Sequence, residues 1–137
     1  MAVIVDASVA IKWVIEEQGS SEARMLIKTE PLAAPDLLFI ECANVLWAKV
    51  RRRLISGPDA RSALQAIEAV PIRSLSTRDH AAAAQAIALE LDQTAYDSLY
   101  LAVALAEHAE LVTADEAFAT AALGNPVYRS SVRLLTS

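Results

Sequence analysis

The fold class follows first from the run Ala2-Val3-Ile4-Val5-Asp6. This run is continuously apolar, contains three β-branched residues and stops at an acid, which is typical of a strand buried on both faces of a parallel sheet. A sheet of that kind needs helices on both faces, because neither face can meet water. The same acid interrupts the apolar run too early for a secretory signal.

The remainder of the chain alternates strand-like and helical segments. Helices are expected at 8–17, 20–28, 37–54, 58–69, 78–91, 94–108 and 115–123, and further strands at 32–34, 70–72, 110–113 and 132–135. Ser8 and Ser20 are candidate N-caps, and Gly57-Pro58 is expected to end the long third helix. The alternation predicts βαβ units with right-handed crossovers and a mostly parallel sheet.

Composition and charge narrow the class of protein to which the chain can belong. The 137 residues suit one domain spanning 1–137, and 55% hydrophobic with 21% charged residues describes a packed globule rather than a disordered chain. A net charge of −5 excludes a general polycation. One cysteine, Cys42, excludes an internal disulfide, and two distant histidines leave no all-protein zinc cage. The longest apolar stretch, 99–106, is far shorter than the roughly 20 residues that span a bilayer. We therefore expect a cytoplasmic protein without a membrane partner.

Four acidic residues stand out because their neighbours are apolar or because they follow strands. Asp6 and Asp115 follow predicted strands, whose carboxyl ends form the ligand-binding edge of open α/β sheets. Glu41 lies on the apolar side of its helix, and Asp97 lies on an apolar face in the first turn of its own helix.

Ordinary capping is the alternative interpretation of these acids. Thr94-x-x-Asp97 and Thr113-x-x-Glu116 both match capping boxes, and Asp6 could be a plain N-cap. Capping does not account for Glu41, which has no basic residue at helical spacing. We therefore predict a shared site in which carboxylates that repel one another bind a cation. Oxygen ligands alone favour Mg²⁺ or Mn²⁺, which suits phosphodiester hydrolysis by a metal-activated water.

The ordered set of motifs resembles a known family over nearly the whole chain. It comprises Val5-Asp6-Ala7-Ser8 with Lys12-Trp13, then Glu41, then Tyr96-Asp97-Ser98-Leu99-Tyr100-Leu101-Ala102, then Thr113-Ala114-Asp115. This set is similar to the PIN-domain ribonucleases of the VapC toxin type. The resemblance implies a three-layer α/β/α sandwich, a Mg²⁺- or Mn²⁺-dependent endoribonuclease, a homodimer and a cognate antitoxin. It also implies catalytic and metal-binding roles for Asp6, Glu41, Asp97 and Asp115, supported by the hydroxyls of Ser8 and Thr113.

Some features fit more than one interpretation. Lys12 could bind RNA phosphate or be a surface lysine, and the run Lys49, Arg51, Arg52 and Arg53 could contact RNA or favour the end of its helix. The role of Glu116 stays open. Two alternative functions also stay open: a PIN-like module that binds RNA or protein without catalysis, and a free-standing PIN nuclease without an antitoxin.

Overall fold

The structure is a computed structural model that describes residues 2–136. Its centre is a five-stranded parallel sheet in the order β3-β2-β1-β4-β5. The strands are β1 (Val3–Val5), β2 (Leu32–Pro35), β3 (Ile72–Leu75), β4 (Glu110–Thr113) and β5 (Val132–Leu134). The helices are α1 (Ala7–Val14), α2 (Ser20–Thr29), α3 (Leu37–Arg51), α4 (Gly57–Ala69), α5 (Ala81–Leu91), α6 (Ala95–Ala106) and α7 (Glu116–Leu123), with short 3₁₀ turns η1 (Arg78–His80) and η2 (Arg129–Ser131).

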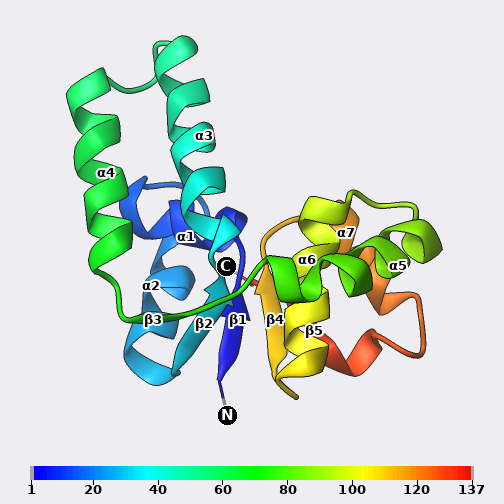
Figure 1. Ribbon diagram of the computed structural model, residues 1–137. Helices are drawn as coiled ribbons and strands as arrows, with labels where there is room; N and C mark the ends of the chain where they lie inside the picture. Colours follow the sequence, from blue (N-terminus) through cyan, green and yellow to red (C-terminus); the bar gives the residue numbers. More distant parts are fainter. Residues whose placement is uncertain (1, 137) are drawn as a thin grey trace.

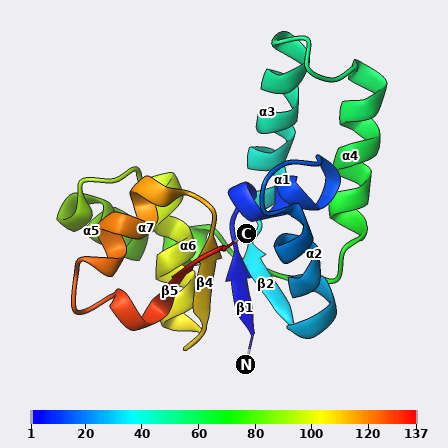
Figure 2. The same cartoon turned by 180° about the vertical axis from the view of Figure 1, so that it is seen from behind.

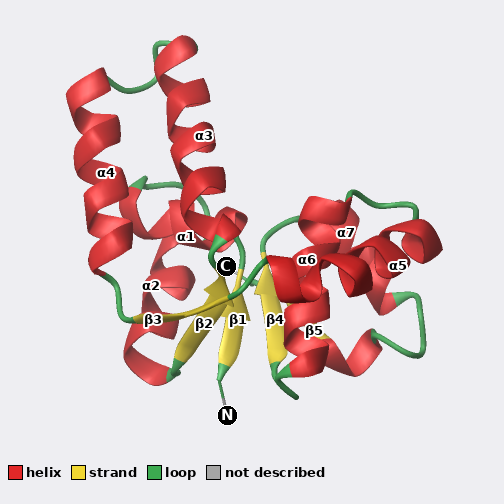
Figure 3. Ribbon diagram, viewed as in Figure 1, coloured by secondary structure: helices red, strands yellow, loops and turns green. Residues whose placement is uncertain are grey.

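The helices form two layers around this sheet. Helices α1 to α4 gather on one side and α5 to α7 on the other in both views (Figures 1 and 2). The yellow strands lie between the two groups of helices in Figure 3. Every residue of 98–104 in α6 is buried, and this helix packs against β1, β2 and β4. The expected α/β/α sandwich with a parallel sheet is therefore confirmed.

The strand order reverses between β1, the middle strand of the sheet, and its neighbour β4. The chain builds β2 and β3 on one side of β1, then crosses the sheet to place β4 on the other side. Such a reversal leaves a crevice at the carboxyl ends of the two strands. Val5 pairs with Val112, so the residues that follow, Asp6 and Thr113, lie level with each other at this crevice.

Helices α3 and α4 pack against each other and extend beyond the sheet as a hairpin (Figure 1). We expected the first of them to reach residue 54 and to end at Gly57-Pro58, which was wrong. The helix ends at Arg51, Arg53 turns the chain with φ of 60°, and Ser56 caps the next helix by accepting a 3.1 Å hydrogen bond from the Asp59 amide. A proline needs no amide partner in a first turn, so Pro58 fits the first turn of α4.

Both serine caps expected near the N-terminus were also wrong. Asp6 caps α1 in place of Ser8, and Gly19, with φ of 88°, occupies the cap position before Ser20. The Ser20 hydroxyl donates to the Ile15 carbonyl and accepts from the Glu17 amide, at 3.1 and 3.0 Å. Ser20 therefore stabilises the turn between α1 and α2, and α1 ends at Val14, three residues earlier than expected.

The edge strand β3 begins at Ile72, two residues later than expected, because Pro71 cannot donate a hydrogen bond to the neighbouring strand.

Within residues 2–136, no helix has the length and apolar character needed to cross a bilayer.

Candidate active site

Asp6 lies directly after β1, at the crevice between the central strands. Its Oδ1 accepts hydrogen bonds from the Ser8 hydroxyl at 2.5 Å and from the Val9 amide at 3.2 Å. Its Oδ2 accepts a 2.5 Å hydrogen bond from the Thr113 hydroxyl at the end of β4. Both oxygens are therefore oriented, one by its own helix and one by the neighbouring strand. Ser8 and Thr113, for which the resemblance implied a supporting role, thus both lie within hydrogen-bond distance of Asp6.

The surroundings of Asp6 disfavour its charge. Desolvation raises its pKa to about 6, and repulsion from Asp97 adds to this effect. The hydrogen bonds from Ser8, Thr113 and Val9 act in the opposite direction, because they favour the ionised form. Asp6 is thus a carboxyl group in a fixed position whose ionised form would be stabilised by a nearby positive charge.

Glu41 lies on α3 and is partly buried, as the helical spacing predicted. Burial raises its pKa, and repulsion from Asp97 and Asp6 contributes further. Its Oε1 accepts a hydrogen bond from the hydroxyl of Tyr100 on α6, a residue 59 positions away. Tyr100 was not predicted as a site residue, although a tyrosine inside the most apolar helix indicates that its hydroxyl needs a buried partner.

Asp97 and Asp115 lie in or just before the first turn of a helix. Thr94 caps α6 by accepting a 3.1 Å hydrogen bond from the Asp97 amide, and the same hydroxyl interacts with the Asp97 carboxylate. Burial raises the pKa of Asp97, and Asp115 raises it further through repulsion. Asp115 caps α7 by accepting a 3.0 Å hydrogen bond from the Phe118 amide. The cap of α7 is therefore Asp115 and not the Thr113–Glu116 capping box of the alternative interpretation, and Glu116 is exposed.

Electrostatic repulsion connects the four predicted acids in one region. Asp6 and Glu41 each interact with Asp97, Glu41 also interacts with Asp6, and Asp97 interacts with Asp115. They do not form a closed cage: across residues 2–136, no three Asp, Glu, His or Cys side chains make a ready group of metal ligands. The four carboxylates therefore lie near enough to repel one another but do not form a preassembled metal site.

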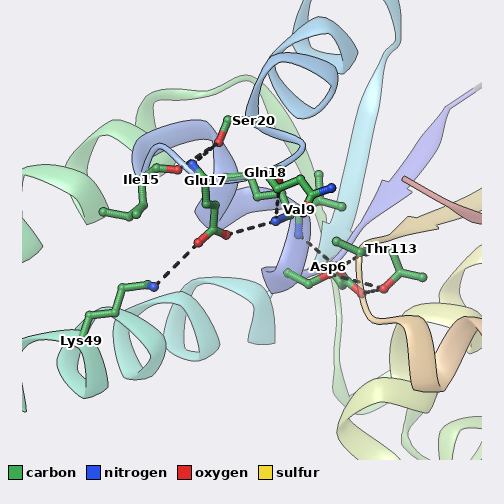
Figure 4. A network of polar contacts seen from close by, with 11 residues as sticks. Asp6, Val9, Ile15, Glu17, Gln18, Ser20, Lys49 and Thr113 are labelled. Atoms are coloured by element: carbon green, nitrogen blue, oxygen red, sulfur yellow. Dashed lines mark hydrogen bonds and ion pairs between the residues drawn. The ribbon is translucent and has the colours of Figure 1, made fainter. Parts of the chain in front are cut away.

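Lys12, the predicted substrate contact, is held by the connection between α1 and α2. Its amino group donates to Glu17 Oε1 at 3.2 Å and to the Gln18 carbonyl at 2.7 Å. Lys49, from α3, lies 3.8 Å from the other oxygen of the same glutamate (Figure 4). Sequence analysis missed Glu17, which joins two lysines from different helices. The rest of the basic run is exposed, and Arg51 lies 5.5 Å from the ring centre of Trp47.

An apolar groove lies beside Glu41. It has a volume of about 540 Å³ and is lined by Ala7, Leu37, Ile40, Glu41, Asn44, Val45 and Tyr96. Ile40 and Tyr96 are 65% and 64% exposed, which is high for such large side chains. The groove therefore places exposed apolar surface next to one of the four acids.

Comparison with known proteins agrees with this geometry. The model of the family described as PIN domain matches residues 3–123. The chain is a PIN-domain protein. This PIN domain is 32% identical over 123 residues to Ribonuclease VapC3 of Pyrobaculum aerophilum, covering 87% of this chain and 93% of that protein. It is 33% identical over 118 residues to Ribonuclease VapC9 of Mycobacterium tuberculosis, covering 82% and 85% of the two chains.

Solved structures show the same PIN fold. The crystal structure of PAE2754 from Pyrobaculum aerophilum matches with a TM-score of 0.70 and 24% identity, over 88% of this chain and 79% of that one. A toxin–antitoxin complex from Klebsiella pneumoniae matches with a TM-score of 0.61 and 19% identity, over 96% and 95%. At these identities the likeness establishes the fold of the PIN domain and nothing more.

Proposed function

We propose that this PIN domain is a Mg²⁺- or Mn²⁺-dependent endoribonuclease of the VapC type and the toxin of a toxin–antitoxin pair. One observation carries the proposal: Asp6, Glu41 and Asp97, from three separate elements, repel one another and all have raised pKa values. Partly desolvated carboxylates held in this way need a cation to compensate their charge. The ribonucleases that are 32% and 33% identical to this chain support the same reaction.

The side chains present fit a hard divalent cation. The candidate ligands are the carboxylate oxygens of the four acids, and the donors that orient Asp6 and Glu41 are hydroxyl and amide groups, which bring no competing positive charge. Mg²⁺ usually takes one or two carboxylates and keeps several waters or substrate oxygens, so carboxylates that do not form a closed cage suit it. When bound, the cation would lower the pKa of a water molecule and compensate the charge that develops on the phosphodiester.

The contribution of the chain itself is to hold these groups in place. Ser8 and Thr113 hold both oxygens of Asp6, while Thr94 holds Asp97 by accepting from its amide and by interacting with its carboxylate. Asp115 is held by its bond to the Phe118 amide. Such preorganisation places the charges before RNA arrives, and catalysis by electrostatic stabilisation depends on it.

The decisive experiment compares RNA cleavage and Mn²⁺ binding for the wild-type chain and Asp97→Asn. The wild type should bind Mn²⁺ and cleave RNA only with the metal, whereas the variant should fold and lose cleavage. Full metal-dependent cleavage by a folded Asp97→Asn protein would contradict the assignment. A wild-type chain that binds RNA without cleaving it would favour the non-catalytic module instead.

The antitoxin is the second part of the proposal. The groove beside Glu41 exposes apolar side chains, and a partner helix that covered it could place an arginine or lysine among the acids. Such a partner would exclude metal and RNA together. The test expresses the chain alone and with each neighbouring reading frame, then measures growth, complex formation and Mn²⁺ uptake. A harmless chain whose metal uptake no neighbour changes would favour a free-standing PIN nuclease.

A further inference from the structure

Tyr100 connects the core of the protein to the acidic site. Tyr100, on α6, is 1% exposed, and its hydroxyl donates a hydrogen bond to Oε1 of Glu41 on α3. Among residues 2–136, no other group donates a hydrogen bond to the Glu41 carboxylate. The orientation of this glutamate therefore depends on one hydroxyl, whereas Asp6 is held by three donors.

Without that hydroxyl, Glu41 would have both a reason and the room to move. Asp97 and Asp6 repel its charge, which favours side-chain conformations directed away from them. The groove of about 540 Å³ includes Glu41 in its lining and offers space in the free protein. A glutamate also has more rotatable bonds than an aspartate, so a single tether has a larger effect on its position.

The chemistry of the donor matters as well as its position. A lysine or arginine in place of Tyr100 would also hold the carboxylate, but its positive charge would compete with a metal ion. A neutral hydroxyl orients the carboxylate and leaves its charge to be compensated by a ligand. Hydrogen-bonding partners of metal-binding carboxylates act in this way, and their loss typically costs roughly 10–100-fold in metal affinity or activity.

We infer that Tyr100 is a positioning residue that keeps Glu41 directed toward Asp6 and Asp97, so that these carboxylates can act on the same cation. The inference rests on the proposed function. Tyr100 is buried in the protein core, so it contacts neither solvent nor RNA. It acts through Glu41 alone.

The test measures Mn²⁺ affinity and steady-state RNA cleavage for Tyr100→Phe. Tyr128→Phe is the matched control, because Tyr128 is also buried and its hydroxyl also donates to a glutamate, Glu90, at 2.6 Å. Both variants lose one hydroxyl and keep the ring, so circular dichroism should report folded proteins. Tyr100→Phe should weaken Mn²⁺ binding roughly 10–100-fold and lower kcat with little change in the KM for RNA. Tyr128→Phe should keep wild-type values for all three.

A double-mutant comparison separates positioning from a general packing effect. If Tyr100 acts through Glu41, the Tyr100→Phe change should have no further effect on Mn²⁺ affinity in a Glu41→Ala background, which has no oxygen left to accept the hydrogen bond. An equal loss in both backgrounds would overturn the inference, as would wild-type Mn²⁺ affinity and kcat in folded Tyr100→Phe. A wild-type chain that neither binds Mn²⁺ nor cleaves RNA would instead refute the proposed function.

If Tyr100→Phe does not fold, Glu41→Asp asks the same question with the core intact. The shorter side chain keeps the charge but does not reach the hydroxyl. Wild-type Mn²⁺ binding by this variant would overturn the inference, because the carboxylate would then bind the cation without the hydroxyl.

Discussion

The hydroxyl of Thr113, at the end of β4, donates a 2.5 Å hydrogen bond to Oδ2 of Asp6, at the end of β1. The same hydroxyl accepts a 3.1 Å hydrogen bond from the Asp115 amide. A single, fully buried side chain therefore connects the first acid of the site to the last one. This connection crosses the point where the strand order reverses, so it depends on the alignment of the two central strands.

Replacing Thr113 with valine should weaken the site while preserving the fold. Valine has nearly the same shape, but the change leaves Asp6 Oδ2 and the Asp115 amide without this partner. Mn²⁺ affinity and RNA cleavage should fall roughly 10-fold or more. Thr29→Val is the control, because the Thr29 hydroxyl bonds only to the Met25 carbonyl on an exposed part of α2. Equal activity in the two variants would contradict a role for this connection.

The metal-free protein should lose stability as pH rises through the range in which Asp6 ionises. Because the folded pKa of about 6 exceeds the ordinary value of 3.8, the folded state binds more protons than the unfolded state between these values. The free energy of unfolding therefore falls from about pH 4 to pH 6, and the penalty is complete above that range.

The Asp6→Asn variant has no carboxyl group to ionise, so it lacks the loss of stability that ionisation of Asp6 causes. At pH 7 without metal, the variant should be more stable than the wild type by about 1–3 kcal/mol, with the difference shrinking toward pH 4. Denaturant unfolding at both pH values measures the difference. Addition of Mn²⁺ should stabilise the wild type and not the variant, since the cation favours the ionised carboxylate. A gain in stability that is the same at pH 4 and pH 7 would show that Asp6 ionisation is not its cause.

Lys12 should contribute to RNA binding through charge. Lys12→Met removes one cation from the pair held by Glu17, whereas Lys28→Met removes one from the exposed surface of α2. If Lys12 contacts phosphate, the salt dependence of binding to single-stranded RNA should decrease by about 0.7 in log–log slope. The Lys28 variant should keep the wild-type slope. Equal slopes for both variants would leave Lys12 with a structural role alone, in the turn between α1 and α2.

The chain should associate with a second copy. Trp47 on α3 is 57% exposed and lines an apolar groove between α3 and α4 together with Leu46, Val50 and Leu64, and exposed apolar surface of this kind marks interfaces. Light scattering at micromolar concentration should give twice the 14.7 kDa chain mass. Trp47→Glu should shift the equilibrium toward the monomer, while Leu89→Glu, on exposed α5, should not. A wild-type monomer at these concentrations would contradict the dimer.

Local pattern was sufficient to predict the class of fold and the position of the acids. The β-branched run before Asp6 forms β1, and the segment Glu110–Thr113, whose last three residues are buried, forms β4, because short runs of such residues favour buried strands. Helical spacing likewise placed Glu41 among apolar neighbours and Asp97 in a first turn. These features depend on residues a few positions apart, so they can be identified in a single sequence.

The resemblance to the PIN family implied that Ser8 and Thr113 support the site, but which atoms they bond, and the Tyr100 partner of Glu41, depend on elements that meet only after folding. Tyr100 reaches Glu41 from 59 residues away, and Thr113 reaches Asp6 from 107 residues away. Glu17, outside any helix, joins Lys12 to Lys49 because α1 packs against α3. Each pairing depends on the strand order and on how the two helical layers lie against the sheet. The tertiary structure alone determines these relations, since no local periodicity encodes the distance between two helices or the order of five strands.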